Sequence, residues 1–204
     1  MASPIDKGVA SRVKRSFLIR IPKVLLIFLL VAAVLVALYH FTAAPIQRLL
    51  YPIQYREAVE DAAAEYGLPP SLIFAVIYTE SKWDADAVSS AGAMGLMQIT
   101  DETYQWARRR AGEDAGDANR LFEPQHNIHY GAAILSLLFE NFSDTATVLA
   151  AYNAGQGHVR LWLADPAYSA DGITLFAIPF EETENYVHRV LHIQQLYQSL
   201  YSIP

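Results

Sequence analysis

The chain has 204 residues, 53% of them hydrophobic and 18% charged, and its formal net charge is −6. This length allows about one ordinary domain besides an N-terminal apolar segment, and the low charged fraction argues against a disordered chain. The absence of cysteine excludes disulfides, thiolate metal sites, a cysteine nucleophile and a lipoprotein anchor.

The charges are distributed unevenly along the chain. Residues 1–23 hold six Lys or Arg and one acidic residue, whereas residues 24–204 hold nine Lys or Arg and twenty acidic residues. An acidic body argues against nucleic acid as a partner, because phosphate contacts need clustered Lys and Arg. We interpret the short basic run Arg108-Arg109-Arg110 as a solvated helix end rather than as an anion site.

An uncharged apolar run over residues 24–41 follows the basic N-terminus. As a helix it would span about 27 Å, close to the hydrocarbon thickness of a bilayer. The positive-inside rule then places residues 1–23 in the cytoplasm and the body across the membrane. A cleaved signal peptide, with Thr42-Ala43-Ala44 as a weak cleavage site, is the alternative. The apolar core is longer than is usual in a signal peptide, so we expect a retained transmembrane helix.

A linker over residues 42–52 and a single body over residues 53–204 are expected next. The body has no alternation typical of strands and no internal repeat, so we predict a mainly α-helical fold. The spacing of apolar residues predicts helices over residues 51–66, 71–81, 101–110, 124–142, 145–154 and 182–201, with loops over 84–95 and 112–119 and an irregular segment over 165–179.

Glu80 lies near the end of the most apolar of these helices, and Val76 and Ile77 lie one turn earlier on its face. Burial among apolar groups and the negative end of the helix dipole both disfavour a carboxylate, so we expect a raised pKa. A carboxyl group that stays protonated near neutral pH can donate its proton to a glycosidic oxygen. This helix alone leaves an outward-facing Glu80 paired with Lys82 as an open alternative.

Several short motifs share an order and spacing. Glu80-Ser81 is followed by Ser89 and by GAMGLMQI over residues 92–99, and later by AYNAG over 151–155 and ETENYV over 182–187. Together they resemble the motifs of the Slt-type lytic transglycosylases, which form glycoside hydrolase family 23 and share a fold with goose-type lysozymes. Phe122-Glu123-Pro124, Asn127-Ile128 and Gly131 resemble the start of the family's intervening helix. The resemblance covers about residues 54–200.

This resemblance implies a lysozyme-like helical domain with a long cleft for a sugar strand, and it places the family catalyst on Glu80. It implies substrate-binding roles for Ser89, Gly95, Met97, Gln98, Tyr152, Asn153, Glu182 and Tyr186. Residue type alone also allows a turn at Gly95, a bracing amide at Gln98 and a core ring at Tyr152. Glu181 leaves the register of the acidic residue open, and Thr100 stands where many relatives have methionine.

The reaction implied by the resemblance uses Glu80 twice. Glu80 first protonates the bond between N-acetylmuramic acid and N-acetylglucosamine, and then takes the proton from the muramyl C6 hydroxyl, which attacks C1 and gives a 1,6-anhydro product. A goose-type-lysozyme-like hydrolase is the nearest alternative and would need a second carboxylate, such as Asp84 or Asp86. A non-catalytic protein that binds peptidoglycan or assists its assembly is the other alternative.

Metals and cofactors are not expected. His126 and His129, like His188 and His192, lack the glutamate of a zinc protease motif between them, and the chain has no phosphate loop or dinucleotide fingerprint. The expected partners are peptidoglycan glycan strands, the membrane through the N-terminal helix, and envelope or cell-wall machinery. The expected location is the bacterial inner membrane, with a cytoplasmic N-terminus and a periplasmic body.

Overall fold

The computed structural model describes residues 23–204, without the side chains of residues 39–44. The chain divides into two compact units, residues 1–45 and 46–204. Apart from Lys23, the predicted cytoplasmic segment 1–23 lies outside the described residues.

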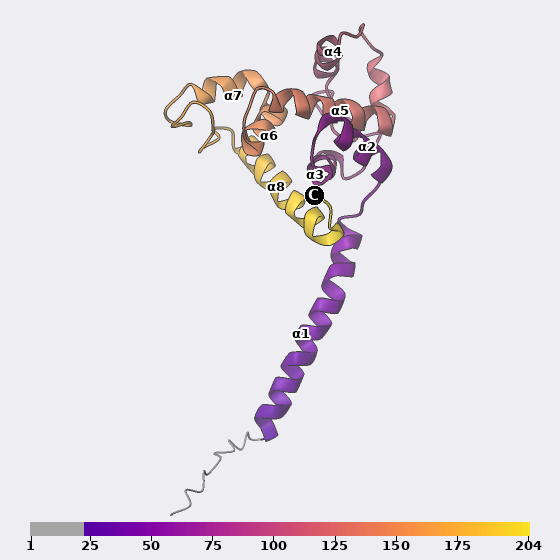
Figure 1. Ribbon diagram of the computed structural model, residues 1–204, viewed down its shortest axis with the longest axis vertical. Coiled ribbons are helices and arrows are strands. Elements are labelled where there is room, and N and C mark those ends of the chain that lie inside the picture. The colour runs from indigo at the N-terminus through magenta and orange to yellow at the C-terminus, as the bar shows by residue number, and fades with distance from the viewer. Residues whose placement is uncertain (1–22) are drawn as a thin grey trace, which may run out of the picture. The chain divides into compact units, whose positions relative to one another are not determined.

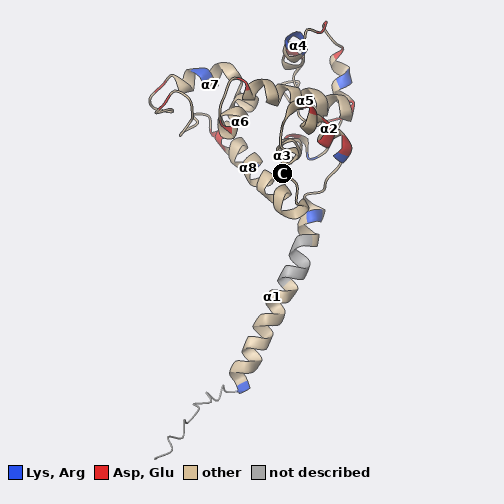
Figure 2. Ribbon diagram, in the orientation of Figure 1, with Lys and Arg blue, Asp and Glu red and all other residues tan. Residues whose placement is uncertain are grey.

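Helix α1, Lys23–Leu50, carries no charged residue between Lys23 and Arg48 (Figure 2). Its side chains over residues 24–38 are exposed, except for the half-buried Ala32. Among the described residues, no helix combines the length and the apolar character that crossing a membrane requires. The predicted transmembrane segment 24–41 and linker 42–52 stay predictions, and the structure shows that the linker is helical as far as Leu50.

The second unit is built from helices, which confirms the mainly α-helical prediction (Figure 1). Only isolated β-bridges, and no strand, occur within the described residues. In chain order the elements of this unit are α2 (Arg56–Tyr66), α3 (Pro70–Ser81), α4 (Asp101–Arg110), the short 3-10 helix η1 (Ala118–Phe122), α5 (Pro124–Phe139), α6 (Thr145–Ala154), α7 (Gln156–Leu163) and α8 (Glu181–Tyr201).

Two helix boundaries differ from the sequence predictions by three residues or more. α2 begins at Arg56 and not at residue 51, because α1 runs to Leu50 and Tyr55, at φ 48°, turns the chain before α2. α5 ends at Phe139, three residues earlier than predicted. The predicted bounds of α4 and α6 are confirmed.

The sequence does not predict α7, because Gly155 and Gly157 flank its first residue and glycine disfavours helix. In the structure, Val159 and Trp162 are buried on one face of this helix. Tertiary burial therefore outweighs the local preference of its first turn.

α3 lies at the centre of the second unit, where residues 71–77 are all buried. It packs along α8 and also contacts α2, while α5 packs against α2 and α6 (Figure 1). The Phe74 ring lies 5.6 Å from the Tyr197 ring and 5.9 Å from the Trp83 ring, between centroids. Because α3 is apolar on all sides and packed on all sides, the position of its C-terminal end is fixed.

The loop between α3 and α4 is held to α5 by one buried side chain, Asn127. The Met97 backbone N–H donates to Asn127 Oδ1 at 2.8 Å, and Asn127 Nδ2 donates to the carbonyl oxygens of Met94 at 3.0 Å and Leu121 at 2.7 Å. Gly95, at φ +72°, lies so close that a Cβ there would overlap Asn127 and the Leu121 carbonyl. This loop is therefore a fixed part of the fold.

Replacing this amide should destabilise the body. In Asn127→Ala, the Met97 N–H and the Leu121 carbonyl lose the partner that Asn127 gives them, while the Met94 carbonyl keeps the Ile99 N–H at 3.1 Å. We expect the free energy of unfolding to fall by about 3 kcal/mol. Urea unfolding measures the change. Asn185→Ala is the matched control, because Asn185 is exposed on α8. A loss for Asn127→Ala within about 0.5 kcal/mol of the control would contradict the bracing role.

Candidate active site

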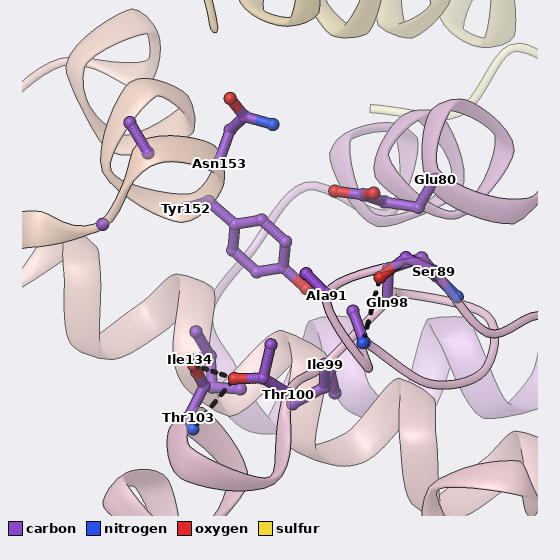
Figure 3. A pocket seen from close by; sticks show the side chains of 13 residues that line it. Glu80, Ser89, Ala91, Gln98, Ile99, Thr100, Thr103, Ile134, Tyr152 and Asn153 are labelled. Atoms are coloured by element: carbon purple, nitrogen blue, oxygen red, sulfur yellow. Dashed lines mark hydrogen bonds between the residues drawn. The ribbon is translucent and has the colours of Figure 1, made fainter.

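A cavity of about 410 Å³ opens beside the C-terminal end of α3 (Figure 3). Its walls come from α3, the loop that follows α3, the start of α4, α5, and the end of α6. Five of the predicted site residues meet there, namely Glu80, Ser89, Gln98, Tyr152 and Asn153. The fold therefore brings together predicted site residues that lie up to 73 positions apart in the sequence, from Glu80 to Asn153.

The Glu80 carboxyl group points into this cavity, toward the Tyr152 ring (Figure 3). Burial raises the pKa of Glu80 from 4.5 to about 7, and the nearby Tyr186 hydroxyl and Arg189 charge oppose the rise. No ion pair joins Glu80 to Lys82 among the described residues. Glu80 thus has the orientation and the raised pKa expected of a proton donor.

Tyr152, at the end of α6, donates a hydrogen bond from its hydroxyl to the Met97 carbonyl oxygen at 2.8 Å. Burial, and then the negative charge of Glu80, raise the pKa of Tyr152 well above its usual value. The hydroxyl therefore stays protonated, and its bond to Met97 fixes the ring that faces Glu80.

Tyr186 approaches Glu80 from α8. Its hydroxyl is buried and forms no well-shaped hydrogen bond within the described residues, yet it lies close enough to lower the pKa of Glu80. Burial first, and then the Glu80 charge, raise the pKa of Tyr186 well above its usual value. Tyr186 therefore affects the pKa of Glu80. It is not among the residues that line the cavity, so its placement gives the predicted substrate contact no support.

Glu182 is exposed and does not line the cavity, so its placement gives the predicted substrate contact no support. One residue later, the buried Thr183 donates a hydrogen bond to Asn153 Oδ1 at 2.7 Å. This bond holds the Asn153 carbonyl oxygen and leaves its amide N–H groups for other partners. The first turn of α8 thus acts on the site through Asn153.

Gln98 both lines the cavity and braces the loop. Its amide nitrogen donates to the carbonyl oxygens of Ala87 at 3.0 Å and Gly95 at 2.9 Å, and its backbone is left-handed at φ 48°. Ser89 accepts a hydrogen bond on Oγ from the Ala93 N–H at 3.0 Å (Figure 3), which leaves its hydroxyl proton to donate elsewhere. Gln98 therefore braces the loop through these two hydrogen bonds, one of the two roles that the sequence left open for it.

Gly95 and Met97 are buried and lie outside the cavity lining. Gly95 gives room for Asn127, and the Met97 side chain packs against Gly131, where a Cβ would overlap it. Met97 reaches the site only through its carbonyl oxygen, which holds Tyr152. Their placement indicates support of the walls and not side-chain contact with a ligand.

The sequence analysis missed Thr103, Ile134 and Arg189. The first two line the cavity from α4 and α5, and Arg189 lowers the pKa of Glu80 from α8. Spacing gives one signal, because Arg189 follows Tyr186 by three residues and so shares its helix face. Thr100 also lines the cavity, and its side chain caps α4 by accepting from the Thr103 N–H at 3.2 Å.

Similarity to known proteins shows the family of the chain. Residues 57–172, more than half of the chain, match the family described as the transglycosylase SLT domain. The chain belongs to this family. It is 31% identical over 151 residues to the soluble lytic murein transglycosylase of Escherichia coli, an alignment that covers 72% of this chain and 23% of that one. It is 32% identical over 167 residues to the membrane-bound lytic murein transglycosylase C of Klebsiella pneumoniae, covering 71% of this chain and 46% of that one.

Solved structures of SLT proteins show the same fold. An inactive mutant of lytic transglycosylase Slt from Pseudomonas aeruginosa aligns with a TM-score of 0.65 and 34% identity, covering 74% of this chain and 25% of that one. The complex of a 70-kDa soluble lytic transglycosylase with bulgecin A aligns with a TM-score of 0.67 and 28% identity, covering 75% of this chain and 25% of that one. The chain spans about a quarter to a half of the length of these relatives. The predicted lysozyme-like fold is confirmed for its body.

The raised pKa of Glu80 predicts how stability depends on pH. Because folded Glu80 holds its proton to a higher pH than unfolded Glu80, folding loses stability as pH rises from about 4.5 to about 7. Glu80→Gln cannot lose this proton. We therefore expect the variant to match the wild type near pH 4 and to exceed it by on the order of 2 kcal/mol at pH 8.

Urea unfolding at pH 4, 6 and 8 measures this difference. Glu184→Gln, an exposed glutamate on α8, is the matched control for removing one carboxylate. A Glu80→Gln difference that stays constant across this pH range would contradict the proposed burial of the carboxyl group.

Proposed function

We propose that this chain is a lytic transglycosylase of peptidoglycan, which cleaves the β-1,4 bond between N-acetylmuramic acid and N-acetylglucosamine. The observation that carries the proposal is a single carboxyl group, Glu80, in the cavity of an SLT-family domain, with a pKa raised to about 7. The names of its relatives, lytic murein transglycosylases, support the same substrate.

In the first step, protonated Glu80 donates its proton to the glycosidic oxygen, and the bond between this oxygen and C1 of the muramyl residue breaks. In the second step, the Glu80 carboxylate takes the proton of the muramyl C6 hydroxyl, whose oxygen forms a new bond to C1. The product is a 1,6-anhydromuramyl end, and Glu80 regains its proton. A pKa of about 7 suits a group that must act first as acid and then as base.

The other groups of the cavity hold the sugar strand in this proposal. The Ser89 hydroxyl and the Asn153 amide N–H groups have hydrogen-bonding capacity left for sugar hydroxyls and N-acetyl groups. The Tyr152 ring forms the wall opposite Glu80 (Figure 3). Positioning the C6 hydroxyl next to C1 supplies the effect of proximity, because nucleophile and electrophile belong to one sugar.

The position of the two nearby aspartates favours this reaction over hydrolysis. Glu80 is the one carboxyl group among the described residues that line the cavity. Asp84 and Asp86 are exposed, and Asp84 Oδ1 accepts a hydrogen bond from the Asp86 N–H within the loop. A goose-type-lysozyme-like hydrolase would need one of them to activate water from the cavity.

Product analysis tests the reaction. Purified peptidoglycan digested by the wild type should release muropeptides that end in 1,6-anhydromuramic acid, identified by mass. Glu80→Gln should lower the release at least about 100-fold, because general acid and base action are both lost. Asp86→Asn, the control, should release the same products as the wild type.

Two results would contradict the proposal. Reducing-end muramic acid in place of the anhydro sugar would favour a hydrolase. Unchanged release by Glu80→Gln would favour a non-catalytic protein that binds peptidoglycan or assists its assembly.

We also propose that the N-terminal part attaches the enzyme to the bacterial inner membrane, with segment 24–41 as the transmembrane helix, residues 1–23 cytoplasmic and the body 53–204 periplasmic. The exposed apolar side chains over residues 24–38 and the basic residues before them support this proposal. A relative whose name calls it membrane-bound is compatible with it. Envelope or cell-wall machinery would then lie within reach of the body.

Fractionation tests the attachment. The whole chain should stay with membranes after extraction with alkaline carbonate. High pH breaks electrostatic contacts with the membrane surface but does not extract a helix that spans the bilayer. A chain that begins at Ile46, the start of the second compact unit, should be extracted. Extraction of the whole chain would contradict the proposal.

A further inference from the structure

The chain reverses directly after the helix that carries Glu80, and two residues other than glycine make the turn. Lys82 has φ 52° and Trp83 has φ 75°, so both backbones are left-handed. A Cβ disfavours this conformation, and a bulky side chain is the least expected one there. Such residues persist only where the surrounding structure imposes the conformation. A contact of this turn with the rest of the body must therefore hold it.

The Trp83 side chain makes that contact. It is 6% exposed, and its ring centroid lies 5.9 Å from that of Phe74 in α3 and 6.3 Å from that of Tyr55, the residue before α2. The ring therefore packs back against the middle of the helix that it follows in the chain. It also packs against the segment that leads into α2.

The indole N–H of Trp83 faces α8. Burial raises the pKa of Tyr197 on that helix, and the Trp83 N–H opposes the rise, which places it close to the Tyr197 hydroxyl. No well-shaped hydrogen bond from this N–H exists among the described residues. The Tyr197 hydroxyl donates its own proton to the Pro52 carbonyl oxygen at 3.0 Å, so its oxygen can still accept. Trp83 thus contacts three separate parts of the fold.

The turn joins the proposed catalytic group to the wall of its cavity. Glu80 lies three residues before Trp83, and the loop over residues 84–99 begins directly after it. That loop gives the cavity Ser89, Ala91, Ala93, Gln98 and Ile99. Trp83 itself does not line the cavity. A change in the turn would therefore move the carboxyl group and the wall relative to each other.

We propose that Trp83 is a positioning residue, whose buried ring imposes the left-handed turn after α3 and so keeps the Glu80 carboxyl group buried and directed into the cavity. The inference rests on the proposed function. Trp83 then holds the start of the cavity-wall loop, while Asn127 holds it near its end through the Met97 N–H. Loss of the Trp83 ring would free the turn and let water reach Glu80.

The pH dependence of the reaction tests this role, because a residue that only adds stability would not move it. In the wild type, the release of anhydromuropeptides should slow as pH rises through about 7, since Glu80 must be protonated for the first step. In Trp83→Leu, better hydration should lower the pKa of Glu80, so this slowing should begin about one pH unit lower. Release at pH 5 should also fall about tenfold, because the carboxyl group is misplaced.

Trp162→Leu is the matched control. Trp162 is also 6% exposed, and its ring packs against Phe180 with the centroids 5.0 Å apart. Both substitutions should lower the midpoint of urea unfolding, because each leaves a cavity in the core. Rates are compared per folded enzyme, at a temperature where unfolding shows both variants to be folded. The control should keep the pH profile of the wild type.

A slowing that begins at the same pH in Trp83→Leu as in the wild type, or an equal shift in Trp162→Leu, would overturn the inference. If Trp83→Leu does not fold, Trp83→Phe takes its place. This variant keeps a smaller ring, and its profile should shift by about half as much, whereas an unshifted profile would overturn the inference in the same way. Failure of the wild type to release anhydromuropeptides would instead refute the proposed reaction.

Discussion

Removal of one carboxyl group from water is the constraint around which the body is arranged. α3 is buried over residues 71–77 and packed along α8, so its last turn has little freedom. Glu80 lies on that turn and faces a cavity, where burial raises its pKa to about 7. A carboxyl group whose pKa lies near neutral pH can donate and regain a proton, and the proposed reaction requires both steps of Glu80.

The walls of the cavity are fixed by bonds between parts of the chain that are distant in sequence. Asn127 on α5 holds the loop after α3, Tyr152 on α6 donates to Met97 in that loop, and Thr183 on α8 donates to Asn153. Each bond ties a cavity residue, or its support, to another element. A site built in this way keeps its groups in place before a ligand arrives, which lowers the cost of ordering them during binding.

A second cavity adjoins the one that contains Glu80. Hydroxyl and amide groups near Glu80 suit the sugar chain of the proposed substrate, whereas Trp106 and Arg109 line the second cavity. The two cavities meet at Tyr152, which lines both. The Tyr152 ring is therefore part of the wall of each.

The sequence by itself determined the helical class, the bounds of α4 and α6, and the group of residues around Glu80, because helical periodicity and short motifs are local properties of the chain. It did not determine α7, whose glycine-rich start is outweighed by the burial of Val159 and Trp162. It also could not separate Met97, which supports the wall of the cavity, from Gln98, which lines it. Those outcomes depend on which helix packs opposite each residue, and only the tertiary structure decides that.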